Sequence, residues 1–580
     1  MTLTVKAIQS VRRLSSVAML VREGLAEIAL PDSVFYNPVQ EFNRDITVAM
    51  LSQFGKMHRK ESLLKKQVDE NCDKSCSLKI LEALSASGIR SVRFALEVPN
   101  VSCVVANDVD PESVMLIKKN IEHNKVSKIV SAVCSDANDL MYQHRKYSER
   151  FNVVDIDPFG TASPFLDSAV QCLHNGGLLC VTSTDMAVLC GSTPGTAMGK
   201  YGGMAIKTSS THEVGLRILL NGIQSAASRY GKIIEPLLSL SVDFYARIFV
   251  RVWSSPISVK AIAAKHGICY TCLGCLAYYI QPLGEALNNN RVVAPARGPP
   301  VGPQCTYCGS KFNVFGPMWI GPLHSRSFLY DFLSDLGYPP GSGGSENHSS
   351  QNIADKDEES PKLPNESETQ LSDQCNLVTN KHYGTIKRIV GMATMAYEEL
   401  PDVPLYYAVD QLASLYGCTI PKLLELHSCF LNANYRVSCS HADKNSLKTD
   451  APHSFVLDCF RVHYEKLREL KNSDSEEHSK EVVETLEKTS IRDKRRARRK
   501  RSCKDNAEDE DTSTEPNSGE DRKTVRSSLL TRPINPSVSF ACHPLANPPS
   551  RNDGLLRYQV NPEKHWGPKS KRKNKVASPQ

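Results

Sequence analysis

The stretch SLKILEALSASGIRSVRFALE, residues 77–97, decides the fold of this chain. Its first part, 77–84, is an apolar run that predicts a buried strand, and the part after Gly88 predicts a helix. A strand, a tight turn of small residues and a helix form the first unit of a nucleotide-binding α/β fold. Small residues let the backbone of the turn approach a ligand closely. Alone the pattern is weak, because only Gly88 is a glycine here and many α/β turns look similar.

Two acids follow at the ends of the next two predicted strands. Asp108 comes about 20 residues after Gly88, the spacing of a carboxylate that accepts hydrogen bonds from ribose hydroxyls. Asp136 closes the third apolar run, where it can bond an adenine amino group while Ala137 offers a backbone N–H. Either acid alone is equally well explained as a helix N-cap or an exposed turn residue. Together the three strand ends favour a cofactor site.

The type of cofactor is indicated by what the turn lacks. No lysine of the kind that binds phosphates occurs in residues 85–88. S-adenosylmethionine (SAM) carries no phosphate and needs no such group, unlike NAD or ATP. The turn therefore favours SAM over a dinucleotide.

The segment FNVVDIDPFG, residues 151–160, predicts the fourth buried strand and ends in Asp157-Pro158-Phe159-Gly160. Ligands bind at this edge of an open α/β sheet. Asp-Pro-aromatic resembles the motif of methyltransferases that act on exocyclic amines. There Asp157 and a backbone carbonyl would accept hydrogen bonds from the amine, Pro158 would fix the backbone, and Phe159 would stack on the base. The alternative is an ordinary strand-ending turn with a packed phenylalanine.

Four cysteines form two CxxC knuckles, Cys272/Cys275 and Cys305/Cys308. Four thiolates satisfy tetrahedral zinc and leave no open position, so we expect a structural rather than a catalytic zinc. The alternatives are free core cysteines, or a site in which Cys269, part of CYTCLGC, replaces one ligand.

Composition limits the remaining possibilities. The 580 residues suggest several domains, and the formal net charge of +7 permits a phosphate-rich partner. No run of about 18 consecutive apolar residues occurs, so we expect no membrane span. The 19 cysteines are an odd number and mostly scattered, which favours a reducing compartment.

Several of these motifs occur in one order that resembles the tRNA guanine-26 N2-dimethyltransferase family. The matching pieces are FYNPVQEFNRD (35–45), SGIR (87–90), NDVD (107–110), DPFG (157–160), LCGS and KYGG (within 189–203), HEVGLRILL (212–220), VDFYARIFVRV (242–252) and NPEKHWGPK (561–569). The resemblance implies that Arg44 and Arg90 bind the SAM carboxylate. It also implies that Phe35 and Phe159 enclose a flipped-out guanine, that Asp157 is the catalytic acceptor, and that two successive transfers take place.

The expected fold class is an α/β, class I SAM-dependent methyltransferase (Rossmann-like) domain with inserted zinc knuckles and a smaller α/β C-terminal domain. The expected segments are a basic N-terminal segment (1–29), the methyltransferase domain (30–260), a zinc-binding region (261–335), a disordered linker (336–380), a C-terminal tRNA-binding domain (381–468), a disordered charged segment (469–530), and a segment packing on the C-terminal domain with a basic tail (531–580).

The expected partner is a tRNA substrate, gripped by the C-terminal domain that carries Lys387 and Arg388; no obligate protein partner is evident. The basic run at 492–501 favours a nuclear location or non-specific RNA affinity. Residues 1–22 lack Asp and Glu, which leaves a mitochondrial presequence open beside an ordinary basic helix. Two other functions remain open: methylation of an exocyclic amine in another RNA, in DNA or in protein, and a non-catalytic RNA-binding protein on a methyltransferase fold.

Overall fold

The computed structural model describes residues 19–30, 36–66, 77–287, 292–340, 382–477 and 519–558. Outside these lie Phe35, most of the expected linker, the basic run at 492–501 and the tail after residue 558. Apart from Phe35 and NPEKHWGPK, the motifs that carry the resemblance lie within the described residues.

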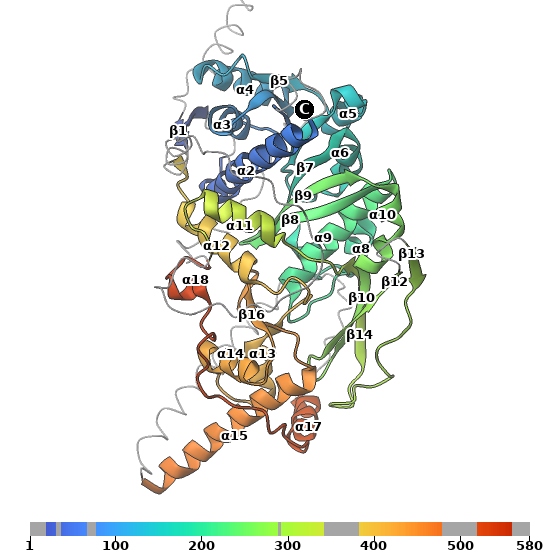
Figure 1. The fold of residues 1–580 in the computed structure, drawn as a ribbon, viewed down its shortest axis with the longest axis vertical. Helices are drawn as coiled ribbons and strands as arrows, with labels where there is room; N and C mark the ends of the chain where they lie inside the picture. The colour runs from blue at the N-terminus through green and yellow to red at the C-terminus, as the bar shows by residue number, and fades with distance from the viewer. Residues whose placement is uncertain are drawn as a thin grey trace, which may run out of the picture.

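A seven-stranded sheet in the order β5-β4-β3-β6-β7-β9-β8 forms the core of the upper part of the molecule in Figure 1. Its strands are β3 (Leu78–Glu82), β4 (Val101–Asp108), β5 (Val130–Cys134), β6 (Phe151–Ile156), β7 (Leu173–Ser183), β8 (Lys232–Val242) and β9 (Tyr245–Ser254). The strands β3 to β7 are parallel, while β9 runs antiparallel to both of its neighbours. The strand order reverses between β3 and β6, which creates a switch point for ligand binding. This sheet confirms the predicted Rossmann-like class I domain.

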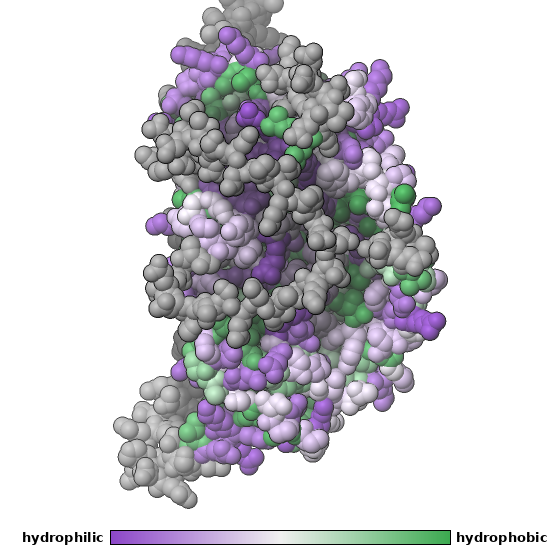
Figure 2. Space-filling model, viewed as in Figure 1, coloured by the Kyte–Doolittle hydropathy of each residue, from purple (hydrophilic) through white to green (hydrophobic). Residues whose placement is uncertain are grey.

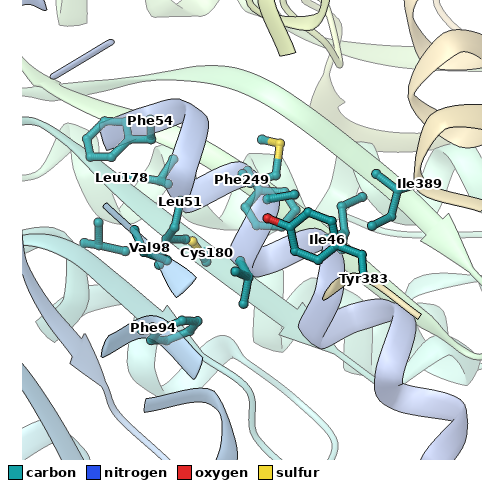
Figure 3. Close-up of a cluster of buried hydrophobic side chains, with 14 of the residues drawn as sticks. Ile46, Leu51, Phe54, Phe94, Val98, Leu178, Cys180, Phe249, Tyr383 and Ile389 are labelled. Atoms are coloured by element: carbon teal, nitrogen blue, oxygen red, sulfur yellow. The ribbon is translucent and has the colours of Figure 1, made fainter. Parts of the chain in front are cut away.

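Helices cover both faces of the sheet because successive strand residues point to opposite sides. On one face lie α2 (Glu41–Lys66), α3 (Ile89–Glu97), α4 (Pro111–His123) and α11 (Arg326–Asp335); on the other lie α5 (Ala137–Gln143), α6 (Leu166–Cys172) and α9 (Thr211–Ser228). Leu178 and Cys180 of β7 face the first layer, whereas Leu179 and Val181 face the second. Figure 3 shows Ile46, Leu51 and Phe54 of α2 gathered beside Leu178 and Cys180 of the sheet.

An N-terminal hairpin, β1 (Met19–Glu23) with β2 (Ala26–Leu30), packs on α3 and α4. The side chains of Asn120 and Asn124 accept hydrogen bonds from the backbone N–H groups of Ala29 and Glu27, at 3.0 and 2.9 Å. Residues 19–29, expected within a separate basic segment, are therefore attached to the methyltransferase domain.

The region after β9 is built from small antiparallel sheets. β10 (His266–Cys272), β11 (Tyr278–Pro282) and β14 (Phe312–Trp319) form one, and β12 (Gly284–Leu287) pairs with β13 (Val292–Pro295). One hydrophobic cluster joins the knuckle cysteines to the C-terminal region. The C-terminal elements are α12 (Ile386–Glu398), α13 (Val409–Tyr416), α14 (Leu423–Asn432), β15 (Tyr407–Ala408), β16 (Val437–Ser440), β17 (Asp443–Thr449), α15 (His453–Glu477), α17 (Gly519–Leu530) and α18 (Pro549–Asn552).

Helix α12 belongs to the core of the methyltransferase domain rather than to a separate body. Its Ile389, Val390 and Ala393 are buried in the same cluster as α2, and Figure 3 shows Tyr383 and Ile389 beside that helix. The C-terminal region is thus packed directly on the catalytic half, through α12 on one side and the knuckles on the other.

The surface of the molecule is mixed in character. On the face in Figure 2, hydrophilic and hydrophobic residues are interspersed among the coloured atoms. Among the described residues, every helix is too short or too polar to cross a bilayer.

Candidate active site

The turn after β3 lies at the switch point of the sheet. Gly88 has φ +77 and begins α3; a Cβ there would lie 3.1 Å from the side chain of Ile117, so glycine satisfies both the conformation and the close packing. The backbone N–H of Ala86 donates to Asp108 Oδ2 at 2.8 Å, and the N–H of Asp110 donates to Oδ1 at 3.0 Å. Asp108 thereby ties the turn to the end of β4. A carboxylate has about four acceptor positions, so Asp108 keeps capacity for hydroxyl donors.

Asp136 and Ala137 lie at the start of α5. Asp136 is the N-cap: its Oδ1 accepts from the N–H groups of Asn138 and Asp139 at 2.8 and 3.2 Å. This is the capping role that the sequence left open as an alternative. Asp136 is exposed, while Ala137 is buried. Their roles toward an adenine ring remain predictions.

Asp157 follows β6 directly, and its side chain is 26% exposed. Arg90, from α3, forms an ion pair with Asp157 Oδ2 and reaches Asp155 Oδ2 at 3.4 Å. Arg247, from β9, binds Asp155 Oδ1 at 2.8 Å. Two aspartates thus alternate with two buried arginines, and Thr47 of α2 accepts from both guanidinium groups.

The charges around Asp157 determine its ionisation. Burial alone would raise the pKa of Asp157, but the positive charges of Arg90 and Arg247, with a hydrogen bond from Thr182, outweigh burial and lower the pKa below its ordinary value. The carboxylate therefore stays ionised at neutral pH. In this state it can only accept hydrogen bonds.

Arg44 and Arg90, the residues expected to bind a SAM carboxylate, are both buried and already paired. Arg44 donates from Nε to Glu23 at 2.6 Å, from Nη2 to the same carboxylate, and from Nη2 to the carbonyl of Asn37 at 3.2 Å. Arg90 uses Nη1 and Nη2 for Thr47 and the two aspartates. Their proposed contact with SAM remains a prediction.

Sequence reasoning missed Glu23, Asp155 and Arg247 as parts of this site. Glu23 is 2% exposed, and it also accepts from the hydroxyl of Tyr36 at 2.6 Å. The signal for Arg247 was available, because an arginine in the apolar run VDFYARIFVRV needs a buried partner. No comparable signal marks Glu23, which lies in an amphipathic hairpin far from Arg44 in sequence.

Of the two aromatic residues expected to enclose the base, Phe159 lies within the described residues and Phe35 does not. Phe159 is 62% exposed and projects from the loop after β6, next to the buried Pro158. An exposed phenylalanine beside a buried proline is suited to stack on a ligand. Phe35 lies outside the described residues, and Tyr36 is the first residue described after it.

The four knuckle cysteines come together. Cys272 Sγ lies 3.4 Å from Cys308 Sγ, Cys275 Sγ lies 3.6 Å from Cys305 Sγ, and all four sulfurs lie within 4.8 Å of one another. Zn–S bonds of about 2.3 Å in a tetrahedron place sulfurs about 3.8 Å apart, so the cluster fits zinc. Cys269 lies three residues before Cys272 on β10, and it packs in a different hydrophobic cluster.

A second group, His324, Glu399 and His441, also has metal-ligand types in close contact. His324 Nδ1 accepts the N–H of Ser239 at 3.3 Å, and His441 Nε2 accepts that of Ser241 at 3.2 Å. Each ring therefore carries its proton on the nitrogen that faces Glu399, and His441 Nδ1 lies 2.6 Å from Glu399 Oε1. Protonated ring nitrogens cannot bind a metal, so we interpret this group as a hydrogen-bonded core.

Comparison with known proteins agrees with this geometry. The family model described as N2,N2-dimethylguanosine tRNA methyltransferase matches residues 15–340 and 367–461. The tRNA (guanine(26)-N(2))-dimethyltransferase of Mus musculus is 37% identical over 590 residues, covering 95% of this chain and 76% of the mouse protein. The mitochondrial enzyme of the same name from Saccharomyces cerevisiae is 36% identical over 474 residues, covering 75% of this chain and 77% of the yeast protein.

Among solved structures, Trm1 from Pyrococcus horikoshii in complex with S-adenosyl-L-methionine is similar in fold and sequence. The TM-score is 0.56 at 26% identity, over 76% of this chain and 98% of that protein. The shared part therefore spans nearly the whole archaeal protein.

Proposed function

Because this chain belongs to the N2,N2-dimethylguanosine tRNA methyltransferase family, we propose that it transfers methyl groups from SAM to the exocyclic N2 of guanine 26 in tRNA. The products are N2-methylguanosine and N2,N2-dimethylguanosine. The observation that carries the proposal is Asp157: an ionised, partly exposed carboxylate at the switch point of a class I sheet, beside an exposed Phe159.

The residues at the strand ends fit SAM. Gly88 keeps the turn close-packed, Asp108 retains acceptor positions, and Val109 exposes 65% of its surface next to that carboxylate. Apolar surface beside an acceptor suits an adenosine group, with hydroxyls on one side and a ring face on the other. Arg44, Arg90, Asp136 and Ala137 complete the proposed set of cofactor-binding residues. When bound, SAM supplies an electrophilic methyl group on a sulfonium sulfur.

Asp157 would act on the amine of the guanine. The N2 lone pair is delocalised into the ring, so the amine is a poor nucleophile until it loses that conjugation. A carboxylate has about four acceptor positions, so besides Arg90 and Thr182 the Asp157 carboxylate can accept one N–H and orient the nitrogen. A carbonyl fixed by Pro158 accepts the other N–H. The negative charge of Asp157 then stabilises the positive charge that develops on nitrogen.

The proton released by the reaction has a simple acceptor. A methylated guanine that is protonated on N2 has lost the conjugation of this nitrogen with the electron-poor ring, so it is a much stronger acid than a carboxylic acid. Asp157 therefore accepts its proton even though the neighbouring arginines lower the pKa of this carboxyl. A strong general base is unnecessary, which agrees with a carboxylate held between positive charges.

The base reaches this site only outside its stack. A flipped nucleotide needs aromatic surfaces to replace its neighbours, and Phe159 offers one. Phe35 would supply the other. The C-terminal region around Lys387 and Arg388 would hold the tRNA body by contacts to phosphates. Arg388 also binds Asp243 at 2.8 Å, so it has a structural role as well.

The four cysteines Cys272, Cys275, Cys305 and Cys308 would hold one structural zinc ion. This zinc would fix the knuckles against the C-terminal helices with which they share a core. For location, the basic run at 492–501 supports a nucleus, while the name of the yeast relative supports a mitochondrial form.

The test is methyl transfer from labelled SAM to tRNA transcripts that differ only at position 26, with analysis of the product nucleosides. We expect N2-methylated guanosine only with guanine 26, and a loss of more than about 100-fold in Asp157→Asn. Asp167→Asn is the matched control, because Asp167 is a partly exposed acid bound by Tyr142 and Tyr230.

Three outcomes would reject the proposal. Equal labelling of the transcript without guanine 26 would favour another RNA position, and labelling of protein or DNA alone would favour the broader amine methyltransferase. SAM-independent tRNA binding with no transfer would favour the non-catalytic alternative.

A further inference from the structure

A cluster of polar side chains contacts the loop that follows Asp157, and the proposed chemistry gives it no role. It is formed by Thr161, Ser183, Asp185, Lys200 and Tyr201. These residues come from three segments: the loop after β6, the end of β7, and α8 (Pro194–Tyr201).

The loop is attached to the chain just after β7 at Gly160, which has φ +90 and open space around its Cβ position. The Gly160 peptide is bound on both sides by Thr184: the N–H of Gly160 donates to Thr184 Oγ1 at 2.9 Å, and the N–H of Thr184 donates to the Gly160 carbonyl at 2.8 Å. The shape of the loop therefore depends on the end of β7.

Tyr201 links this loop to Asp185. Its side chain is 1% exposed, and its hydroxyl lies 2.7 Å from Thr161 Oγ1 and 3.0 Å from Asp185 Oδ1. Burial raises the pKa of Tyr201 and the Asp185 carboxylate raises it further, so the hydroxyl keeps its proton. A carboxylate only accepts, so Tyr201 donates to Asp185 and Thr161 donates to Tyr201.

Asp185 is the common acceptor of the cluster. Ser183 Oγ donates to its Oδ1 at 2.6 Å, and Lys200 Nζ binds its Oδ2 at 3.2 Å. Ser163 Oγ also donates to the carbonyl of Lys200 at 2.6 Å, which adds a second connection between the loop and α8. Such a chain, anchored on a charge, is stronger and more rigid than separate neutral hydrogen bonds.

We propose that Asp185 and Tyr201 are positioning residues that hold the Asp157–Gly160 loop, and with it Phe159, in the geometry for methyl transfer. The inference rests on the proposed role of that loop. Neither residue contacts the reacting atoms; they act through Thr161 and the Gly160 peptide. A displacement of about 1 Å at a reacting group can cost about 100-fold in rate.

The test is single-turnover methyl transfer at saturating SAM and tRNA, with SAM affinity measured separately. For Tyr201→Phe we expect a rate about 10- to 100-fold lower while the Kd for SAM changes less than about twofold. Asp185→Leu should fall as far, and Asp185→Asn should recover most of the rate because an amide oxygen still accepts from Tyr201. Tyr416→Phe is the matched control: it removes a buried hydroxyl that donates to the carbonyl of Leu457 at 3.1 Å, far from the loop.

Each result supports or overturns the positioning role of Tyr201 and Asp185. A normal rate in Tyr201→Phe overturns the inference, and so does a weaker SAM affinity that accounts for the whole loss. If Tyr201→Phe does not fold, Thr161→Val, which removes the same link from the loop side, replaces it under the same criteria. The proposed function is tested apart from this, since Asp157→Asn in the same assay must be inactive whether or not Tyr201 matters.

Discussion

The strongest prediction for stability concerns a buried charge cluster that joins the methyltransferase domain to the C-terminal region. Glu213 and Arg217 lie on α9, Glu399 follows α12, and Lys448 lies on β17. Lys448 Nζ is 3.0 Å from Glu213 Oε2 and 3.2 Å from Glu399 Oε2, while Arg217 binds Glu213 at 2.8 Å. Two carboxylates thus face two cations, and all four side chains are at most 2% exposed.

Lys448→Met removes one of the two positive charges and leaves a negative charge uncompensated in the core. Breaking a buried pair in this way costs about 3–5 kcal/mol, because the remaining charge has lost its partner but not its burial. The matched control is Lys56→Met: Lys56 pairs with Asp335 at 3.1 Å, but both side chains are at least a third exposed. A surface pair of this kind contributes about 0–1 kcal/mol.

The pH dependence of this loss has a definite sign. Burial alone would raise the pKa of Glu399, but the positive charge of Lys448, together with His441 and a hydrogen bond from His324, holds this pKa well below its ordinary value of 4.5. The stabilisation it gives is therefore present above about pH 4.5 and is lost as pH falls further. Without Lys448, burial raises the pKa of this carboxyl, so the variant can neutralise it by protonation. The deficit should be largest at pH 7–8 and smaller at pH 5.

Urea unfolding followed by circular dichroism at pH 7.5 and pH 5 measures both effects. The double variant Lys448→Met/Glu399→Gln should regain part of the lost stability, since the uncompensated charge is gone. If Lys448→Met is no more destabilising than Lys56→Met, the buried-charge reasoning is wrong. The same holds if its deficit does not shrink at pH 5.

Three further predictions concern the active site and the knuckles. Arg90→Met should raise the pKa of Asp157, because burial then acts against fewer positive charges; the acid limb of the single-turnover rate should move to higher pH, and an unchanged profile would contradict this. Cys275→Ser should lower the zinc content measured by atomic absorption from about one equivalent to near zero, whereas Cys269→Ser, a change in a buried cysteine outside the cluster, should retain the metal. Phe159→Ala should weaken transfer to tRNA by about 5- to 150-fold, corresponding to about 1–3 kcal/mol of base stacking, with normal SAM affinity by calorimetry; a normal rate would exclude stacking.

The strand ends of the site were predictable because local patterns determine them. Apolar runs followed by polar residues located Gly88, Asp108 and Asp157 at the ends of three parallel strands, and parallel strands bring such ends to one edge. The four knuckle cysteines were predictable for a similar reason, since the CxxC spacing alone brings two thiols together.

The partners of the arginines were not predictable, because they depend on contacts between distant segments. Nothing near Arg44 in sequence indicates that Glu23 of a preceding hairpin binds it, and nothing near Arg90 indicates that Asp155 and Asp157 share its guanidinium. The position of α12 could not be predicted from the sequence for the same reason. Its apolar spacing predicts a helix with one buried face but cannot say which surface covers that face.

The contacts around α12 also connect the C-terminal region to the active site. Thr385, just before α12, donates from its backbone N–H and its hydroxyl to Asp45 Oδ2, at 2.9 and 2.7 Å. Asp45 lies on α2 beside Arg44, and Thr47 on the same helix accepts from Arg90. A shift of α12 would therefore move α2, the helix whose Thr47 accepts hydrogen bonds from Arg90 and Arg247. The region expected to grip tRNA is therefore connected, through α12 and α2, to the arginine that binds Asp157, the carboxylate proposed to act on the amine.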